Sequence, residues 1–230
     1  MKYKYLFFDL DHTLWDYHAN SAKALTQLYN EYRLNSYFET PSEFIAIYNQ
    51  YNDELWELYR QGDILKEELR YRRFRDTFRE KELFDEKLPV VIGDLYLEIT
   101  PRLNVLFPNA IETLEYLKSR SYNLYILTNG FLKTQEIKLE NSGLDKFFKK
   151  IFSSDELGIN KPHKDFFHWV ISSLNARKSD CLMIGDDEKV DVGGAKNYGI
   201  DAIWFNSIDQ KQSGKAIKTI SNLVQLKEFL

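Results

Sequence analysis

Two aspartates, Asp9 and Asp11, follow an apolar run at the start of the chain, and Thr13 comes two positions later. Residues two apart in an extended chain point to the same side, so both carboxylates are expected to face one small volume. At about 4 Å and an effective dielectric constant near 20, two unit charges repel by roughly 4 kcal/mol. A hard divalent cation with oxygen ligands would offset that repulsion. The spacing therefore predicts a metal site or an acid pair that handles protons.

A second acidic cluster follows the apolar residues 182–184. It consists of Asp186, Asp187 and Asp191. In an open parallel sheet, functional groups gather at the carboxyl ends of the strands. We therefore expect the two acidic clusters to converge at one edge of such a sheet.

Groups that could hold an oxyanion follow two other segments. Thr128 and Asn129, with Gly130 behind them, offer a hydroxyl and backbone N–H groups. Lys161, directly before Pro162, offers a positive charge for phosphate oxygens. Each feature alone is common in turns, caps and helix starts. Their order and their complementary charge favour one combined site.

Short apolar runs separated by helix-length amphipathic stretches predict the elements that would position these groups. The runs expected as buried strands are residues 5–10, 124–127, 151–152, 181–184 and 202–205. Their alternation with helices predicts an α/β fold with a Rossmann-like, doubly wound parallel sheet. Residues 1–15 and 104–230 are expected to form this core.

Residues 16–103 show a different pattern, with apolar residues every three or four positions and no convincing strand. Helical stretches are expected at residues 21–34, 42–63, 65–84 and 88–99. The third stretch interleaves arginines with aromatic residues, but acids alternate with them, so a solvated helix face is favoured over a nucleic-acid surface. We expect an inserted α-helical domain.

Composition and charge argue against several classes of protein. A formal net charge of −4 over 230 residues disfavours a nucleic-acid polymer as the main partner. Asp9 interrupts the N-terminal apolar run long before the length of a signal peptide or membrane span. The single cysteine, Cys181, excludes a disulfide framework and is typical of a reducing compartment. We expect a cytoplasmic protein without a membrane partner, and a monomer is the simpler expectation.

Taken in order, these motifs resemble those of the haloacid dehalogenase-like hydrolase superfamily over nearly the whole chain. The matching positions are Asp9-x-Asp11-x-Thr13, Thr128, Lys161 and Gly185-Asp186-Asp187 with Asp191. The helical insertion resembles the first class of cap domain in that family. Residues 7–16 and 128–144 are similar to the branch that includes pyrimidine 5'-nucleotidases. His12 stands where many members have glycine, and it is expected to be a loop residue rather than a third catalytic group.

The resemblance implies a Mg²⁺-dependent phosphatase that hydrolyses small phosphomonoesters. Asp9 would attack phosphorus and form an aspartyl-phosphate. Asp11 would protonate the leaving alcohol and then deprotonate the attacking water. The Mg²⁺ would be held by the Asp9 carboxylate, the Asp11 main-chain carbonyl and the Asp186 carboxylate.

The resemblance also implies supporting roles. Residues expected to support the metal ligands are Asp187, Asp191 and Thr13. Residues expected to hold the phosphate oxygens are Thr128, Asn129 and Lys161. Residues that could contact a base or sugar, or equally pack at the hinge to the helical domain, are Trp15, Tyr17 and His18.

A nucleoside 5'-monophosphate is the leading substrate, and a sugar-phosphate phosphatase or phosphomutase on the same core stays open. Asp11 argues against a dehalogenase of this superfamily, which needs no acid there. A phosphonatase needs a lysine in the cap, and Lys23 and Lys66 lie in stretches without that resemblance. A receiver-like phospho-aspartate signalling module is shorter and lacks the inserted domain. A non-catalytic binding protein is disfavoured because every chemically required position is filled.

Overall fold

The computed structural model describes residues 2–209 and 214–230. The chain divides into two compact units. One, the α/β unit, comprises Met1–Tyr17 and Asn104–Leu230, and the other, the helical unit, comprises His18–Leu103.

The sheet of the α/β unit contains six parallel strands within the described residues. They are β1 (Tyr5–Phe8), β2 (Asn123–Thr128), β3 (Ile151–Ser153), β4 (Cys181–Gly185), β5 (Asp201–Phe205) and β6 (Lys218–Ile220). Their order is β3-β2-β1-β4-β5-β6, so the chain winds outward from β1 first to one side and then to the other. This arrangement confirms the predicted doubly wound α/β fold and its five expected strands. Strand β6 was not expected.

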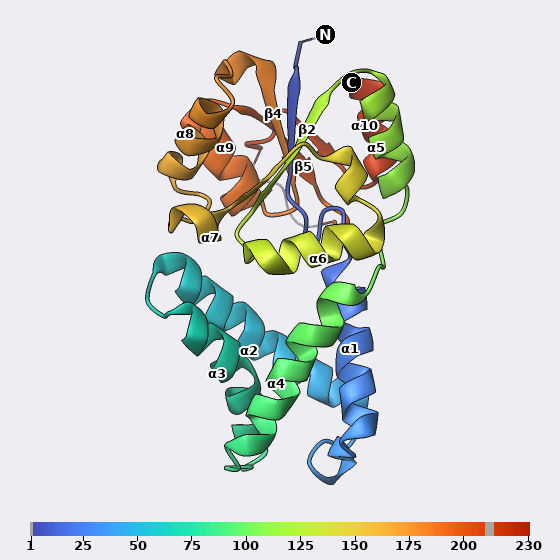
Figure 1. The fold of residues 1–230 in the computed structure, drawn as a ribbon, viewed down its shortest axis with the longest axis vertical. Coiled ribbons are helices and arrows are strands. Elements are labelled where there is room, and N and C mark those ends of the chain that lie inside the picture. The colour runs from blue at the N-terminus through green and yellow to red at the C-terminus, as the bar shows by residue number, and fades with distance from the viewer. Residues whose placement is uncertain (1, 210–213) are drawn as a thin grey trace. The chain divides into compact units, whose positions relative to one another are not determined.

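Helices cover both faces of this sheet, with α5 and α10 on one side and α8 and α9 on the other (Figure 1). The helices of this unit are α5 (Ala110–Ser119), α6 (Leu132–Ser142), α7 (Ser154–Leu157), α8 (Lys164–Ser173), α9 (Gly194–Tyr198) and α10 (Leu226–Phe229). Helix α8 packs Phe166, Phe167 and Val170 into a cluster with Phe7 of β1 and Met183 of β4. Because both faces are covered, the central strands are continuous apolar runs.

Strand β1 ends at Phe8, two residues earlier than expected, because the chain then closes into a tight loop. The backbone N–H groups of Leu14 and Trp15 both donate to the carbonyl of Leu10, each at 2.9 Å. His12 lies in this loop with φ of 63°, a left-handed conformation that glycine adopts most readily. The loop carries Asp9 and Asp11 out of the strand direction, so the alternation of an extended chain does not continue past Phe8.

The beginning of β5 is tied to the N-terminal segment through Asp201. Its carboxylate accepts hydrogen bonds from Lys2 Nζ at 2.9 Å, Tyr3 Oη at 2.8 Å and Lys196 Nζ at 3.3 Å. The bond from Lys2 contributes most, and together these donors lower the pKa of Asp201 to about 2. Asp201 therefore stabilises the folded state while it is ionised.

The helical unit confirms the four expected helices. They are α1 (Tyr17–Glu31), α2 (Pro41–Gln61), α3 (Lys66–Arg79) and α4 (Lys87–Ile99). Thr40 caps α2 by accepting from the N–H of Glu43, and Gly62 ends the helix at a φ of 83°. The core of this unit is largely aromatic, with Phe38, Phe44 and Phe78 in contact. No helix in the described ranges combines the length and apolar character needed to cross a membrane.

Candidate active site

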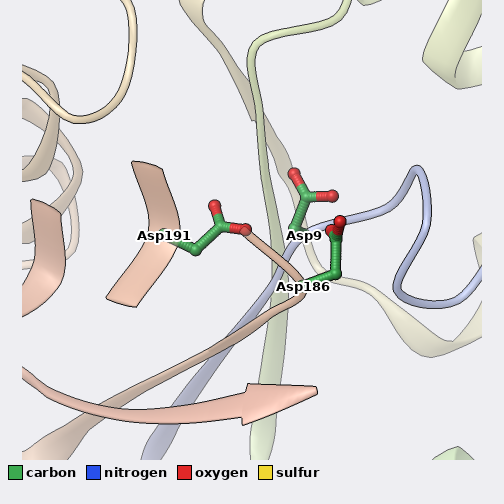
Figure 2. Close-up of side chains that lie close together, drawn as sticks. All are labelled: Asp9, Asp186 and Asp191. Carbon is green, nitrogen blue, oxygen red and sulfur yellow. The ribbon is translucent and has the colours of Figure 1, made fainter. Parts of the chain in front are cut away.

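Three carboxylates meet beyond the ends of β1 and β4, and their ligand atoms all lie within 4.8 Å of one another (Figure 2). Asp9 directly follows β1, and Asp186 directly follows β4. These strands are neighbours, with Phe8 paired to Ile184, and so the two acids leave the sheet at the same edge. Asp191 comes from the π-helical segment Glu188–Gly193 that follows. The edge lies where the strand order reverses, the usual position of a ligand site in this architecture.

Lys161 is the cation of this cluster and is only 1% exposed. Its Nζ donates to Asp9 Oδ1 and Asp191 Oδ1, both at 2.7 Å, and to the carbonyl of Leu127 at 2.6 Å. Burial alone would lower the pKa of Lys161, but the two carboxylates raise it above its ordinary value. Lys161 is therefore charged and joins the first acidic cluster to the second.

Burial raises the pKa of each acid in the cluster. The pKa of Asp9 rises to about 8, even though the charge of Lys161 opposes the change. The pKa of Asp186 is well above its ordinary range because of burial and the nearby charges of Asp9 and Asp191, and that of Asp191 is also raised. One lysine therefore does not offset three buried carboxyl groups, and each of them takes up a proton more readily than an ordinary aspartate.

The donor set fits a hard divalent cation such as Mg²⁺, which prefers carboxylate oxygens. Asp191 already uses both oxygens, because Oδ1 accepts from Lys161 and Oδ2 accepts from the N–H of Asp187 at 3.2 Å. Asp9 and Asp186 are therefore the carboxylates suited to hold the ion. Asp191 instead fixes the position of Lys161.

Asp186 is held in place by two hydrogen bonds from distant segments. Thr13 Oγ1 donates to Asp186 Oδ1 at 3.0 Å, which links the first acidic motif to the last. Trp204 Nε1 donates to the main-chain carbonyl of Asp186 at 2.7 Å. Asp187 caps the π-helical segment, because its Oδ1 accepts the N–H groups of Lys189 and Val190, and its own N–H donates to Asp191.

The carboxylate of Asp11 is bound by helix α6. Lys138 Nζ donates to Asp11 Oδ1 at 2.6 Å, and Gln135 Nε2 donates to Asp11 Oδ2 at 2.9 Å. Burial alone would raise the pKa of Asp11, but the charge of Lys138 and these hydrogen bonds lower it below its ordinary value. Asp9 and Asp11 thus each have a lysine partner of their own. Sequence reasoning missed Gln135 and Lys138, whose signal was their spacing of three on one helix face.

Thr128 and Asn129 lie at the end of β2, next to the same edge. Thr128 Oγ1 accepts from the N–H of Gly130 at 2.9 Å and from Gln135 Nε2 at 3.3 Å. The side chain of Asn129 bonds both ways to the main chain of Lys161, accepting its N–H at 2.8 Å and donating to its carbonyl at 3.0 Å. Asn129 therefore fixes the segment that carries the buried lysine.

The aromatic residues after the first motif occupy different environments. Trp15 is fully buried, and Lys138 Nζ lies 4.4 Å from its ring centroid. The ring of Tyr17 lies 4.9 Å from that of His12, and Tyr17 is half-buried. His18 is exposed and begins the helical unit. Trp15 therefore packs beneath the site, whereas Tyr17 and His18 keep accessible surface.

Comparisons with known proteins agree with this geometry. The sequence profile of haloacid dehalogenase-like hydrolases matches residues 3–199. The chain is 34% identical to the pyrimidine 5'-nucleotidase PynA of Streptococcus pneumoniae over 90% of this chain and 85% of that protein. It is 28% identical to the pyrimidine 5'-nucleotidase YjjG of Escherichia coli over 100% and 99% of the two chains.

A solved structure of the HAD-hydrolase YfnB from Bacillus subtilis, bound to magnesium, superposes with a TM-score of 0.90 at 28% identity. The match covers 100% of this chain and 99% of that chain. The fold, the order of the motifs and the length of the match agree. The protein belongs to the haloacid dehalogenase-like hydrolase family.

Proposed function

We propose that this hydrolase is a Mg²⁺-dependent phosphatase of small phosphomonoesters and that pyrimidine nucleoside 5'-monophosphates are its preferred substrates. The observation that carries the proposal is the buried Lys161, which bridges Asp9 and Asp191 beside Asp186. A fixed cation beside a metal site with oxygen ligands is the arrangement that binds an anionic phosphate group. The nucleotide preference is proposed because the chain is similar in sequence to the pyrimidine 5'-nucleotidases PynA and YjjG.

In the first step, a carboxylate oxygen of Asp9 forms a bond to phosphorus while the bond from phosphorus to the ester oxygen breaks. Lys161 orients Asp9 through its 2.7 Å ion pair. Asp11 is ionised in the free protein, so it takes up a proton before this step and then gives that proton to the leaving oxygen, which departs as an alcohol.

In the second step, water attacks phosphorus, and Asp11 accepts a proton from that water. The bond from phosphorus to the Asp9 oxygen breaks, which frees inorganic phosphate and restores the carboxylate. Thr128 holds a phosphoryl oxygen through its hydroxyl in both steps, and Lys161, whose three N–H donors are used by Asp9, Asp191 and the Leu127 carbonyl, contributes its positive charge.

Asp9, Asp186 and the main-chain carbonyl of Asp11 would hold Mg²⁺, which supplies positive charge to the transferring phosphoryl group. Thr13 and Trp204 keep Asp186 in position for that role. The lone buried Cys181 fits a reducing compartment, and we place the protein in the cytoplasm.

The test is phosphate release from a panel of nucleoside monophosphates and sugar phosphates, with Mg²⁺ and with a chelator. We expect the highest kcat/KM with UMP or CMP, and loss of turnover in the chelator. Asp9→Asn is expected to abolish turnover, because an amide is a poor nucleophile, while it keeps the circular-dichroism spectrum unchanged. A panel in which no ester is hydrolysed would refute the proposed activity, and a preference for sugar phosphates would refute the proposed substrate.

A further inference from the structure

Helix α6 presents two buried polar side chains to the proton-handling acid. Gln135 is 1% exposed and Lys138 is 5% exposed, and they occupy both oxygens of the Asp11 carboxylate. A carboxylate held at both oxygens by buried donors has little freedom to rotate. The contacts therefore fix where the Asp11 oxygens point.

Gln135 also connects Asp11 to the phosphate-holding segment. Its Nε2 donates to Asp11 Oδ2 at 2.9 Å and to Thr128 Oγ1 at 3.3 Å, so one amide nitrogen spans the two groups. This amide fills the space where a side chain at residue 130 would begin, since a Cβ on Gly130 would clash with Gln135 Nε2. Gly130 is thus required as glycine to admit the bridge.

The buried Oε1 of Gln135 has no hydrogen-bond partner among the described residues. Leaving a buried acceptor unsatisfied costs about 1–3 kcal/mol. The amide keeps this orientation because its nitrogen faces an acceptor on Asp11 and another on Thr128. A purely structural glutamine would gain more by satisfying both ends, so the arrangement favours control of Asp11 over stability.

Lys138 holds the second oxygen from a rigid platform. Its Nζ lies 2.6 Å from Asp11 Oδ1 and 4.4 Å from the ring centroid of the fully buried Trp15. The backbone of Trp15 pairs with that of Asp11, and the carbonyl of Trp15 accepts the N–H of His12 at 2.9 Å. Trp15 therefore supports both the loop that carries Asp11 and the Lys138 side chain that binds Asp11.

We propose that Gln135 and Lys138 are positioning residues that hold Asp11 in register with the Thr128 phosphate-binding segment for proton exchange with the leaving-group oxygen. This inference rests on the proposed phosphatase function. A displacement near 1 Å of a reacting group can cost about 100-fold in rate. Loss of either contact should consequently weaken acid catalysis while the nucleophile Asp9 stays in place.

Comparing two substrates with different leaving groups distinguishes a role in positioning Asp11 from a general structural effect of the substitution. An alkyl oxygen, as in UMP, leaves poorly without a proton, whereas p-nitrophenolate leaves readily as the anion. Because kcat/KM reports only the steps through departure of the leaving group, it isolates the step in which Asp11 acts as an acid. Damage to the fold, the metal site or Asp9 would lower kcat/KM for both esters alike.

The experiment measures kcat/KM for UMP and for p-nitrophenyl phosphate in the wild type and in four variants. Gln135→Leu removes both hydrogen bonds with little change in volume, and Lys138→Met removes the ion pair. Asp11→Asn removes the acid itself and shows the largest effect to be expected, a decrease in kcat/KM for UMP of about 10²- to 10⁴-fold. Lys133→Met is the matched control, because this lysine lies on the same helix with its side chain 83% exposed.

We expect Gln135→Leu and Lys138→Met to lower kcat/KM for UMP about 10- to 100-fold and to change that for p-nitrophenyl phosphate less than about threefold. Lys133→Met should match the wild type. Equal losses on the two esters, or an unchanged value for UMP in Gln135→Leu, would overturn the positioning role. If Lys138→Met does not fold, Gln135→Leu decides alone. Failure of the proposed function would be seen separately, as a wild type that cleaves neither ester or an Asp11→Asn variant without leaving-group dependence.

Discussion

Replacing Lys161 with methionine should destabilise the metal-free protein strongly, because it leaves Asp9 and Asp191 buried without a cation. Their ligand atoms lie within 4.8 Å, and at an effective dielectric constant near 20 two unit charges at that distance repel by about 3.5 kcal/mol, which is an upper limit because proton uptake by either acid removes the repulsion. The Leu127 carbonyl also loses its donor at 2.6 Å. Breaking a buried ion pair from one side generally costs about 3–5 kcal/mol. We therefore expect Lys161→Met to lower the free energy of unfolding by about 4 kcal/mol in the presence of a chelator.

Urea unfolding followed by tryptophan fluorescence measures this change. Trp15, Trp169 and Trp204 lie in the α/β unit and report on it. The control Lys133→Met should stay within about 0.5 kcal/mol of the wild type, as is usual for surface substitutions. Added Mg²⁺ should recover part of the loss in Lys161→Met, because the ion supplies positive charge to the same acids. A loss in the chelator no larger than that of the control would refute the electrostatic account of the cluster.

Three further changes test other parts of the structure. Asp201→Asn should lower the free energy of unfolding by about 1 kcal/mol at pH 7, after allowance for solvent screening, because the ionised group is favoured in the folded state. Since the folded-state pKa is about 2, that difference should be present above pH 4 and disappear as the pH falls to 2 in acid-unfolding curves. Gly185→Ala should displace the Asp191 carboxyl, with which a Cβ would clash, and calorimetry should show a lowered Tm together with lost phosphatase activity. Thr13→Val removes the 3.0 Å hydrogen bond to Asp186 and should weaken Mg²⁺ binding about 10-fold in isothermal titration calorimetry, whereas an unchanged affinity would exclude this supporting role.

The sequence predicted the sheet well because its strands are buried on both faces. The runs that became β1, β2, β4 and β5 are apolar nearly throughout, and no helix-length stretch competes with them. Strand β6 escaped notice because its three residues, Lys218–Ile220, include a single apolar side chain. The end of β1 was misplaced because Leu10 is apolar and buried, although its carbonyl accepts the N–H groups that close the following loop.

The site was predictable to the extent that short motifs encode it. Asp9 and Asp186 each follow a strand, and strand order brings them to one edge, whereas Lys161 lies directly before Pro162 in a segment that Asn129 holds at that edge. Gln135 and Trp204 could not be found in this way. Gln135 binds Thr128, and Trp204 binds Asp186, and neither contact is part of a short sequence motif. Both residues lie in regular elements whose spacing of apolar residues predicts packing and gives no sign of a role in the site.

The expectation that the Asp9 and Asp11 carboxylates face one small volume depended on an extended backbone between the two residues and is wrong, since each carboxylate has its own lysine partner. The left-handed turn at His12 and the loop around Leu10 direct the Asp11 carboxylate to α6 instead. Sequence periodicity predicts regular elements, but it cannot predict that the Asp11 side chain is bound by helix α6, more than 120 residues further along the chain.

The most direct test of the account is to trap the covalent intermediate on Asp9. The protein would be mixed with UMP and Mg²⁺, quenched in acid within milliseconds, and reduced with borohydride, which converts an aspartyl-phosphate to homoserine. Peptide mass spectrometry should find homoserine at position 9 and none in Asp9→Asn. Homoserine at another aspartate, or steady phosphate release with no modified residue at any quench time, would contradict the assignment of Asp9 as the nucleophile.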